Sequence, residues 1–151
     1  MKTTIYIEGG ATGAYSREQC IRCERAFHKL LDRMGFTGRK PRLVACGGRG
    51  DVYKDFCTAH RSRGNGWVAM WIDSEDPMAD IERAWKHLAE VTTVSRWEKP
   101  DGATDDQVLF MTTCMETWIV ADRAALREHY GHRLQENQLP PLGTRPDLNR
   151  H

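Results

Sequence analysis

The chain has 151 residues, of which 40% are hydrophobic and 28% charged, and its formal net charge is +1. A chain of this size and composition fits one globular domain with a substantial core and is too short for two ordinary domains. The near-neutral charge excludes a polycationic protein, so any contact with nucleic acid has to come from a local basic patch.

The first half of the chain alternates predicted strands and helices. Residues 3–8 (TTIYIE) predict a short apolar strand, and the apolar spacing over residues 16–34 predicts an amphipathic helix. A second strand is expected at 42–46 (RLVAC). A shorter helix is expected at about 51–60, with Asp51 as its cap.

The second half repeats this alternation. The continuous apolar run at 66–73 (GWVAMWID) is typical of a strand buried on both faces. A helix is expected at 77–91, with Asp76 as N-cap and Pro77 in the first helical position. The remaining predicted elements are a strand at 108–114 and a helix at 115–131 that is interrupted or re-capped at Asp122.

This alternation predicts an α/β fold with a mostly parallel four-stranded sheet flanked by helices, as in Rossmann-like proteins. The domain is expected to cover residues 1–131. Residues 132–151 show no periodicity and contain three prolines, which predicts an irregular C-terminal tail.

The cysteines and the apolar runs indicate where the protein resides. The five cysteines are odd in number, and the apolar stretch within the first ten residues is too short for a secretory signal. No apolar run approaches the roughly 18 residues that a membrane span needs. We therefore expect a reduced, cytoplasmic protein.

Acidic residues stand where the predicted strands end. Glu8 ends the first strand, Asp73 ends the third, and Glu75 follows two positions later, on the same side if the chain stays extended. The carboxyl ends of parallel strands lie at one edge of a sheet, where ligands bind in such folds. Carboxylates repel one another unless a cation lies among them, and Mg²⁺ prefers oxygen ligands. The pattern therefore predicts a Mg²⁺ or Mn²⁺ site at Glu8, Asp73 and Glu75.

Some of the acids near these strand ends also fit ordinary structural roles. Asp76 is better explained as a helix cap, and Glu75 could interact with the dipole of the next helix. Glu116, after the fourth strand, is either a further catalytic acid or an acid in the first turn of a helix.

The cysteine pair of the first predicted helix has two possible roles. Cys20 and Cys23 have zinc-like spacing, but they also continue the apolar face of that helix. Cysteine on such a face behaves as a small hydrophobic residue, which favours a packing role.

Basic residues follow the second predicted strand. Arg49 and Lys54 come after the glycine turn at 47–48, with Arg61 and Arg63 further on. Such a cluster is often only a solvated surface. Beside an acidic metal site, however, Arg49 and Lys54 become candidates for contacts with nucleic-acid phosphates.

The motifs IYIEGG, GGRGDVYKDF, WIDSEDP and FMTTCMETWIVADRAAL resemble the Toprim domain over about residues 4–131. They resemble still more closely an uncharacterised bacterial Toprim-related family, often encoded beside ABC-type ATPases in apparent phage-defence modules. In Toprim domains a glutamate ends the first strand and an Asp-x-Asp or Asp-x-Glu pair ends a later one. The resemblance implies that Glu8 is a general acid or base or a metal ligand, and that Asp73 and Glu75 hold Mg²⁺.

Two functions follow from these observations as hypotheses. The first is a metal-dependent, nuclease-type hydrolase that cleaves phosphodiester bonds in DNA or RNA. The second is a non-catalytic interaction module that keeps the scaffold and binds an ATPase partner.

Overall fold

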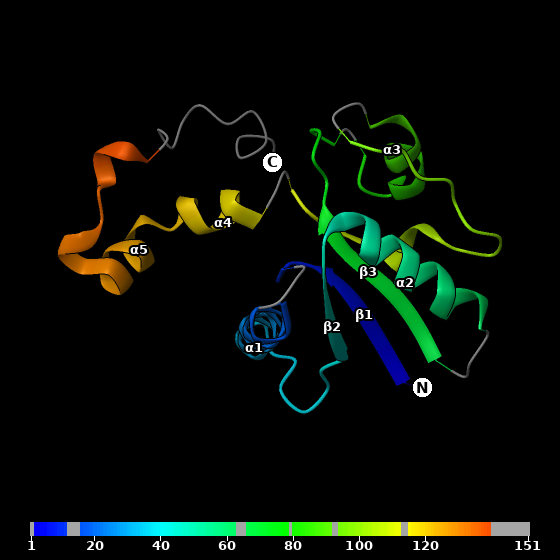
Figure 1. The fold of residues 1–151 in the computed structure, drawn as a ribbon, viewed down its shortest axis with the longest axis horizontal. Coiled ribbons are helices and arrows are strands. Elements are labelled where there is room, and N and C mark those ends of the chain that lie inside the picture. The colour runs from blue at the N-terminus through cyan, green and yellow to red at the C-terminus, as the bar shows by residue number, and fades with distance from the viewer. Residues whose placement is uncertain are drawn as a thin grey trace.

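The computed structural model describes residues 2–11, 16–62, 66–78, 80–91, 94–112 and 115–139. Within these ranges the chain forms a four-stranded sheet in which every neighbouring pair is parallel (Figure 1). The strand order is β2-β1-β3-β4, so β1 and β3 lie side by side at the centre. This confirms the predicted α/β fold. The strands are β1 (Lys2–Glu8), β2 (Arg42–Gly47), β3 (Gly66–Asp73) and β4 (Val108–Met111).

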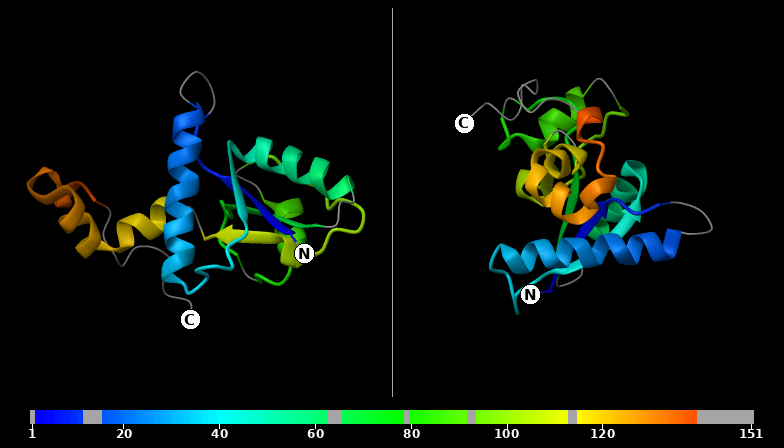
Figure 2. Two further views of the ribbon diagram at one scale, coloured as in Figure 1. Left: turned by 90° about the horizontal axis from the view of Figure 1, so that it is seen from below. Right: turned by 90° about the vertical axis from the view of Figure 1, so that its left-hand side faces the viewer.

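Helices cover the two faces of the sheet unequally. Helix α1 packs on one face, while α2 and α3 pack on the other (Figure 2). Helices α4 and α5 extend away from the sheet (Figure 1). None of the described helices is long and apolar enough to cross a lipid bilayer. The helices are α1 (Ser16–Arg33), α2 (Arg49–Arg61), α3 (Ala84–Glu90), α4 (Met115–Ala121) and α5 (Arg123–Tyr130), and 3₁₀ turns occur at Asp105–Gln107, Gly131–Arg133 and Glu136–Gln138.

Alternating residues of the central strands divide the core into two layers, because successive side chains of a strand point to opposite faces. Met70 and Ile72 of β3 pack with α2 and α3, whereas Ala69 and Trp71 pack with α1. Trp71 meets Phe27 of α1 edge to face, with ring centroids 4.8 Å apart. The continuous apolarity of β3 is thus explained by burial on both sides.

The structure corrects two predicted helix boundaries. Helix α3 begins at Ala84, so the prediction of a helix starting at Pro77 with Asp76 as its cap is wrong. The N–H of Trp85 instead donates to the Asp105 carboxylate, 2.9 Å away, which stabilises the start of α3 from a distant part of the chain. Helix α2 begins at Arg49 after Gly48, so Asp51 lies in its first turn and does not cap it.

The predicted break at Asp122 is present in the structure, where α4 ends at Ala121 and α5 begins at Arg123. The side chain of Asp122 accepts the N–H of Ala125 and caps α5, which confirms that a new helix begins here. The first part of the predicted tail contains the two short 3₁₀ turns that follow α5. Residues 140–151 of that tail lie outside the described residues.

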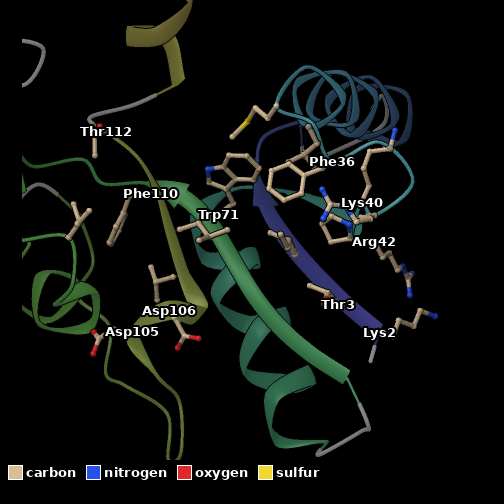
Figure 3. A pocket seen from close by; sticks show the side chains of 18 of the residues that line it. Lys2, Thr3, Phe36, Lys40, Arg42, Trp71, Asp105, Asp106, Phe110 and Thr112 are labelled. Atoms are coloured by element: carbon tan, nitrogen blue, oxygen red, sulfur yellow. The ribbon is translucent and has the colours of Figure 1, made fainter.

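An open apolar groove of about 1310 Å³ lies beside α1, over the part of the sheet that this helix leaves uncovered (Figure 3). Trp71 and Leu109 contribute to its floor, and Phe36 stands at one side. Lysines and arginines gather at one end of the groove, and Asp105 and Asp106 lie at the other.

Candidate metal centre

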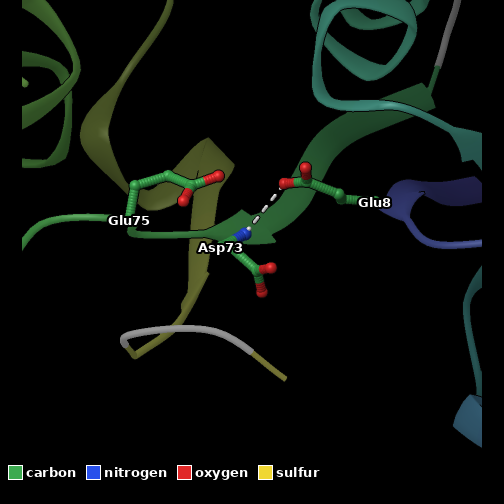
Figure 4. A group of neighbouring side chains, drawn as sticks. All are labelled: Glu8, Asp73 and Glu75. Atoms are coloured by element: carbon green, nitrogen blue, oxygen red, sulfur yellow. Dashed lines mark hydrogen bonds between the residues drawn. The ribbon is translucent and has the colours of Figure 1, made fainter. Parts of the chain in front are cut away.

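A β-bulge near the end of β1 determines the direction of the Glu8 side chain. Pairing between β1 and β2 shifts register between Ile7 and Glu8, so Cys46 is left without a partner in the ladder. Such bulges re-aim the side chains beside them. Beyond the bulge, Gly9 and Gly47 exchange two backbone hydrogen bonds of 3.0 and 2.9 Å, which fix the end of β1. Glu8 then accepts the backbone N–H of Asp73 at 3.0 Å (Figure 4).

Positions 9 and 10 both require glycine, because of their backbone angles and because of the atoms that surround them. Their φ angles are 148° and 92°, a region that residues with side chains rarely adopt. A Cβ atom on Gly9 would lie 2.8 Å from the sulfur of Cys23, and one on Gly10 would lie 2.8 Å from that of Cys20. The chain after Glu8 can therefore turn tightly against α1 only because both residues are glycines.

The segment after β3 carries a rare turn that positions Glu75. The N–H of Ser74 continues the ladder to Met111, and the N–H of Asp76 donates to the Ser74 carbonyl at 2.8 Å. Glu75, between them, has a φ of 65°. Together these features define a γ-turn with positive φ at its centre, a strained conformation for a residue with a side chain. On the sequence alone, Glu75 joins the other acids if the chain stays extended here, whereas in the structure a turn directs its side chain toward Glu8.

The side chains of Glu8, Asp73 and Glu75 converge at the carboxyl ends of β1 and β3 (Figure 4). One carboxylate oxygen from each residue lies within 4.8 Å of the others. All three residues are half-buried, which leaves the cluster open to solvent on one side. The sequence-based expectation that these three acids meet is thus correct.

Arg49 enters the same cluster from the first turn of α2. Its Nη1 donates to the Asp73 carbonyl at 2.7 Å and lies 3.9 Å from the Glu8 carboxylate. The arginine side chain is only 10% exposed. Its Nε and Nη2 are buried without a hydrogen-bond partner in the described part of the chain. Arg49 is therefore placed among the acids and not on the open surface.

An aromatic stack holds the Arg49 guanidinium in place. The guanidinium carbon lies 4.4 Å from the ring centre of Trp97, a distance at which cation–π attraction operates. Trp97 in turn stacks on Tyr53 at 4.5 Å with the rings nearly parallel. The Tyr53 hydroxyl donates to the Glu98 carbonyl at 2.7 Å. This stack fixes a positive charge at the rim of the acidic cluster.

The charge balance of the site leaves room for another cation. Burial lowers the pKa of Arg49, while Glu8, Glu75, Asp73 and Asp76 oppose this effect. Arginine stays protonated in proteins, so it supplies one positive charge to this group of carboxylates. Three carboxylates that can each offer one oxygen form a donor set suited to Mg²⁺ or Mn²⁺, which keep several water ligands. The residues present thus fit a divalent ion.

One other predicted site residue, Lys54, lies away from the described cluster. Lys54 is exposed on α2, more than one helical turn beyond Arg49. Glu116 lies in α4, but its side chain falls outside the described residues.

Sequence reasoning missed two residues that support the site. Trp97 stacks on Arg49, and the Nε2 atom of His87 lies 2.8 Å from the Ser74 carbonyl. Neither residue stands at the end of a strand, so the signal that revealed the acids does not mark them.

The cysteines do not form a metal site within the described ranges, where Glu8, Asp73 and Glu75 are the only cluster of potential ligands. Cys20 and Cys23 instead pack against Gly10 and Gly9, which is the packing role that the sequence favours. Burial raises the pKa of Cys23 to about 11, so its thiol is protonated and a poor ligand at neutral pH.

Comparison with known proteins found no matching family model, no matching curated protein and no matching solved structure. The fold and the acid cluster therefore rest on the chain's own geometry, and membership of the Toprim-related family stays a prediction.

Proposed function

We propose that this protein is a divalent-metal-dependent phosphodiesterase that acts on nucleic acid. The observation that carries the proposal is the convergence of Glu8, Asp73 and Glu75 within 4.8 Å of one another. This convergence occurs at the carboxyl ends of two adjacent parallel strands, where α/β folds place their ligands. The resemblance to Toprim domains adds to this support.

The three acids have separate roles in the proposed reaction. Asp73 and Glu75 hold the ion, which when bound polarises the scissile phosphate and lowers the pKa of an attacking water. Glu8 orients that water and accepts its proton. Arg49, held by Trp97 beside the acids, adds a fixed positive charge that favours the binding of a phosphate group next to the ion.

The competing interpretation is that Arg49 alone neutralises the acids and that the cluster is only structural. Glu8 accepts the N–H of Asp73, so simple removal of its side chain would also damage the fold. Glu8→Gln is the sharper variant, because glutamine keeps an acceptor oxygen for this N–H while removing the charge. Asp73→Asn follows the same logic, and Glu90→Gln on the exposed end of α3 is the matched control.

The experiment combines metal binding with cleavage. Mn²⁺ should raise the melting temperature of the wild type and of Glu90→Gln, with about 2.7 kcal/mol of added stability at a free concentration of 100 Kd. Glu8→Gln and Asp73→Asn should lose most of this shift. Cleavage of end-labelled DNA and RNA in Mg²⁺ or Mn²⁺ should fall by roughly 10²–10⁴-fold in Glu8→Gln, the range for loss of a general base.

Two results would oppose the proposal. Unchanged cleavage by both acid variants would remove the mechanism. A protein whose melting temperature does not respond to either ion would instead support the second hypothesis, a non-catalytic module that binds an ATPase partner.

A further inference from the structure

The outward face of α1 carries a row of four exposed cations, Arg22, Arg25, Lys29 and Arg33, here called the basic stripe. Their spacings of three, four and four residues place them on one side of a helix. At 1.5 Å per residue the stripe is about 16 Å long. A linear array of positive charge of this kind matches a linear polyanion.

The acids of α1 do not neutralise this stripe. Glu24 accepts the backbone N–H of Ala45 at 3.0 Å, so it serves the contact between α1 and β2. Asp32 binds Lys40 and Thr37 at the far end of the helix. Only Glu18 pairs with a member of the stripe, Arg22. The other three stripe cations form no ion pair with any residue in the described ranges.

Positive charge is concentrated in this part of the chain. Residues 16–42 contain eight lysines and arginines against three acids, although the whole chain carries a net charge of only +1. A local excess of this size creates a positive potential that attracts polyanions despite the near-neutral total.

The packing of α1 favours nucleic acid over a membrane as the polyanion. A helix that lies on a bilayer buries its apolar face among the lipids. The apolar face of α1 already packs on the sheet through Phe27 and Leu31, which are 4% and 6% exposed. The face of α1 that points away from the sheet carries the basic stripe, and phosphate groups are its natural partners.

One end of the basic stripe lies near the acidic cluster. Cys20 and Cys23, which flank Arg22 on α1, pack against Gly10 and Gly9, the residues that follow Glu8. The Arg22 end of the stripe therefore lies at the edge of the sheet where the acids converge. The Arg33 end lies toward the opposite edge, where β2 begins after the helix.

We propose that the basic stripe is a docking track for the phosphate backbone of nucleic acid and binds it without metal and without base specificity. This inference rests on the proposed function only in taking nucleic acid as the substrate. Binding is expected to weaken steeply with salt, with a slope of log Kd against log[salt] of about 3 for four contacts to a single strand.

The test measures binding of a fluorescein-labelled 20-nucleotide single strand by anisotropy, in EDTA and at several salt concentrations. The triple variant Arg25→Glu, Lys29→Glu and Arg33→Glu should lose at least 100-fold in affinity and most of the salt slope. The matched control reverses three exposed cations outside α1, Arg61, Lys86 and Lys99, with the same change in net charge. The control variant should retain affinity within about threefold.

Three outcomes would overturn the docking track. They are wild-type affinity in the triple variant, equal losses in both variants, and binding of the wild type to phosphatidylserine vesicles but not to the oligonucleotide. All binding is measured in EDTA, where no divalent ion can occupy the acid cluster. A metal site that fails its own test therefore leaves this measurement unaffected, and the two proposals can fail separately.

Discussion

At the scale of single residues, Glu75 combines a useful side chain with an unfavourable backbone. Its φ of 65° at the centre of a γ-turn is costly for a residue with a Cβ atom. Strained residues of this type persist where surrounding contacts hold them, and they concentrate at functional sites. Here the hydrogen bond from Ser74 to Met111 and the contact of His87 with the Ser74 carbonyl hold the turn from two sides.

Glu75→Gly should therefore separate stability from metal binding. Glycine adopts positive φ without the Cβ penalty, so the free energy of unfolding should rise by about 1 kcal/mol. The same change removes one carboxylate, so the Mn²⁺-induced rise in melting temperature should shrink. Urea unfolding with and without Mn²⁺ measures both effects. Glu75→Gln serves as the control, since it removes the same charge but keeps the strained backbone, so glycine should give the more stable of the two variants.

At the scale of elements, local patterns predicted the strands better than the helix boundaries. The strand at 66–73 matches β3 because a long apolar run needs burial on both faces, which the two helical layers provide. The helix at 77–91 was predicted too long because Asp76 and Pro77 resemble a helix start. The true start depends on Asp105, twenty residues downstream of Trp85, and no local pattern reports such a contact.

The C-terminal helices offer a test of local stability. The Asp122 carboxylate accepts the Ala125 N–H at 3.0 Å and caps α5, and α5 extends away from the sheet (Figure 1). Asp122→Ala should destabilise this helix by about 1 kcal/mol. Amide hydrogen exchange followed by mass spectrometry should become faster in residues 123–130 and stay unchanged in β1 and β3. Faster exchange throughout the sheet would mean that α5 and the sheet unfold together.

At the scale of the whole molecule, the sequence was sufficient to predict which acids meet and to name Arg49 as a candidate beside them, but it did not reveal Trp97. Glu8 and Asp73 end adjacent parallel strands, so the topology itself brings them together. Arg49 reaches the cluster because α2 begins beside the same strand ends, and Trp97 arrives from a loop without periodicity. Side chains supplied by loops depend on tertiary packing, which explains why Trp97 was missed.

Two half-buried thiols should make the stability of the molecule depend on alkaline pH. Burial raises the pKa of Cys23 to about 11 and that of Cys46 to about 12, against 9.0 in an unfolded chain. Above pH 9 the unfolded state loses these protons first, so the folded state is then disfavoured. The contribution of the two thiols to the free energy of unfolding should therefore be constant through pH 8 and fall as pH rises from 9 toward 11.

Urea titrations between pH 7 and 10.5 measure this slope. The variant with Cys23→Ala and Cys46→Ala should start from a lower stability, because it loses packed side chains, and should show a shallower decline. A decline as steep as that of the wild type would assign the alkaline effect to other groups.

The bond from the Asp73 N–H to Glu8 has an evolutionary consequence. Glutamine at position 8 would satisfy the same backbone group, so a descendant carrying it would fold, accumulate in the cell and resist proteolysis while lacking the proposed chemistry. Inactive copies of this protein should thus be recognisable by an amide at one position in an otherwise intact scaffold.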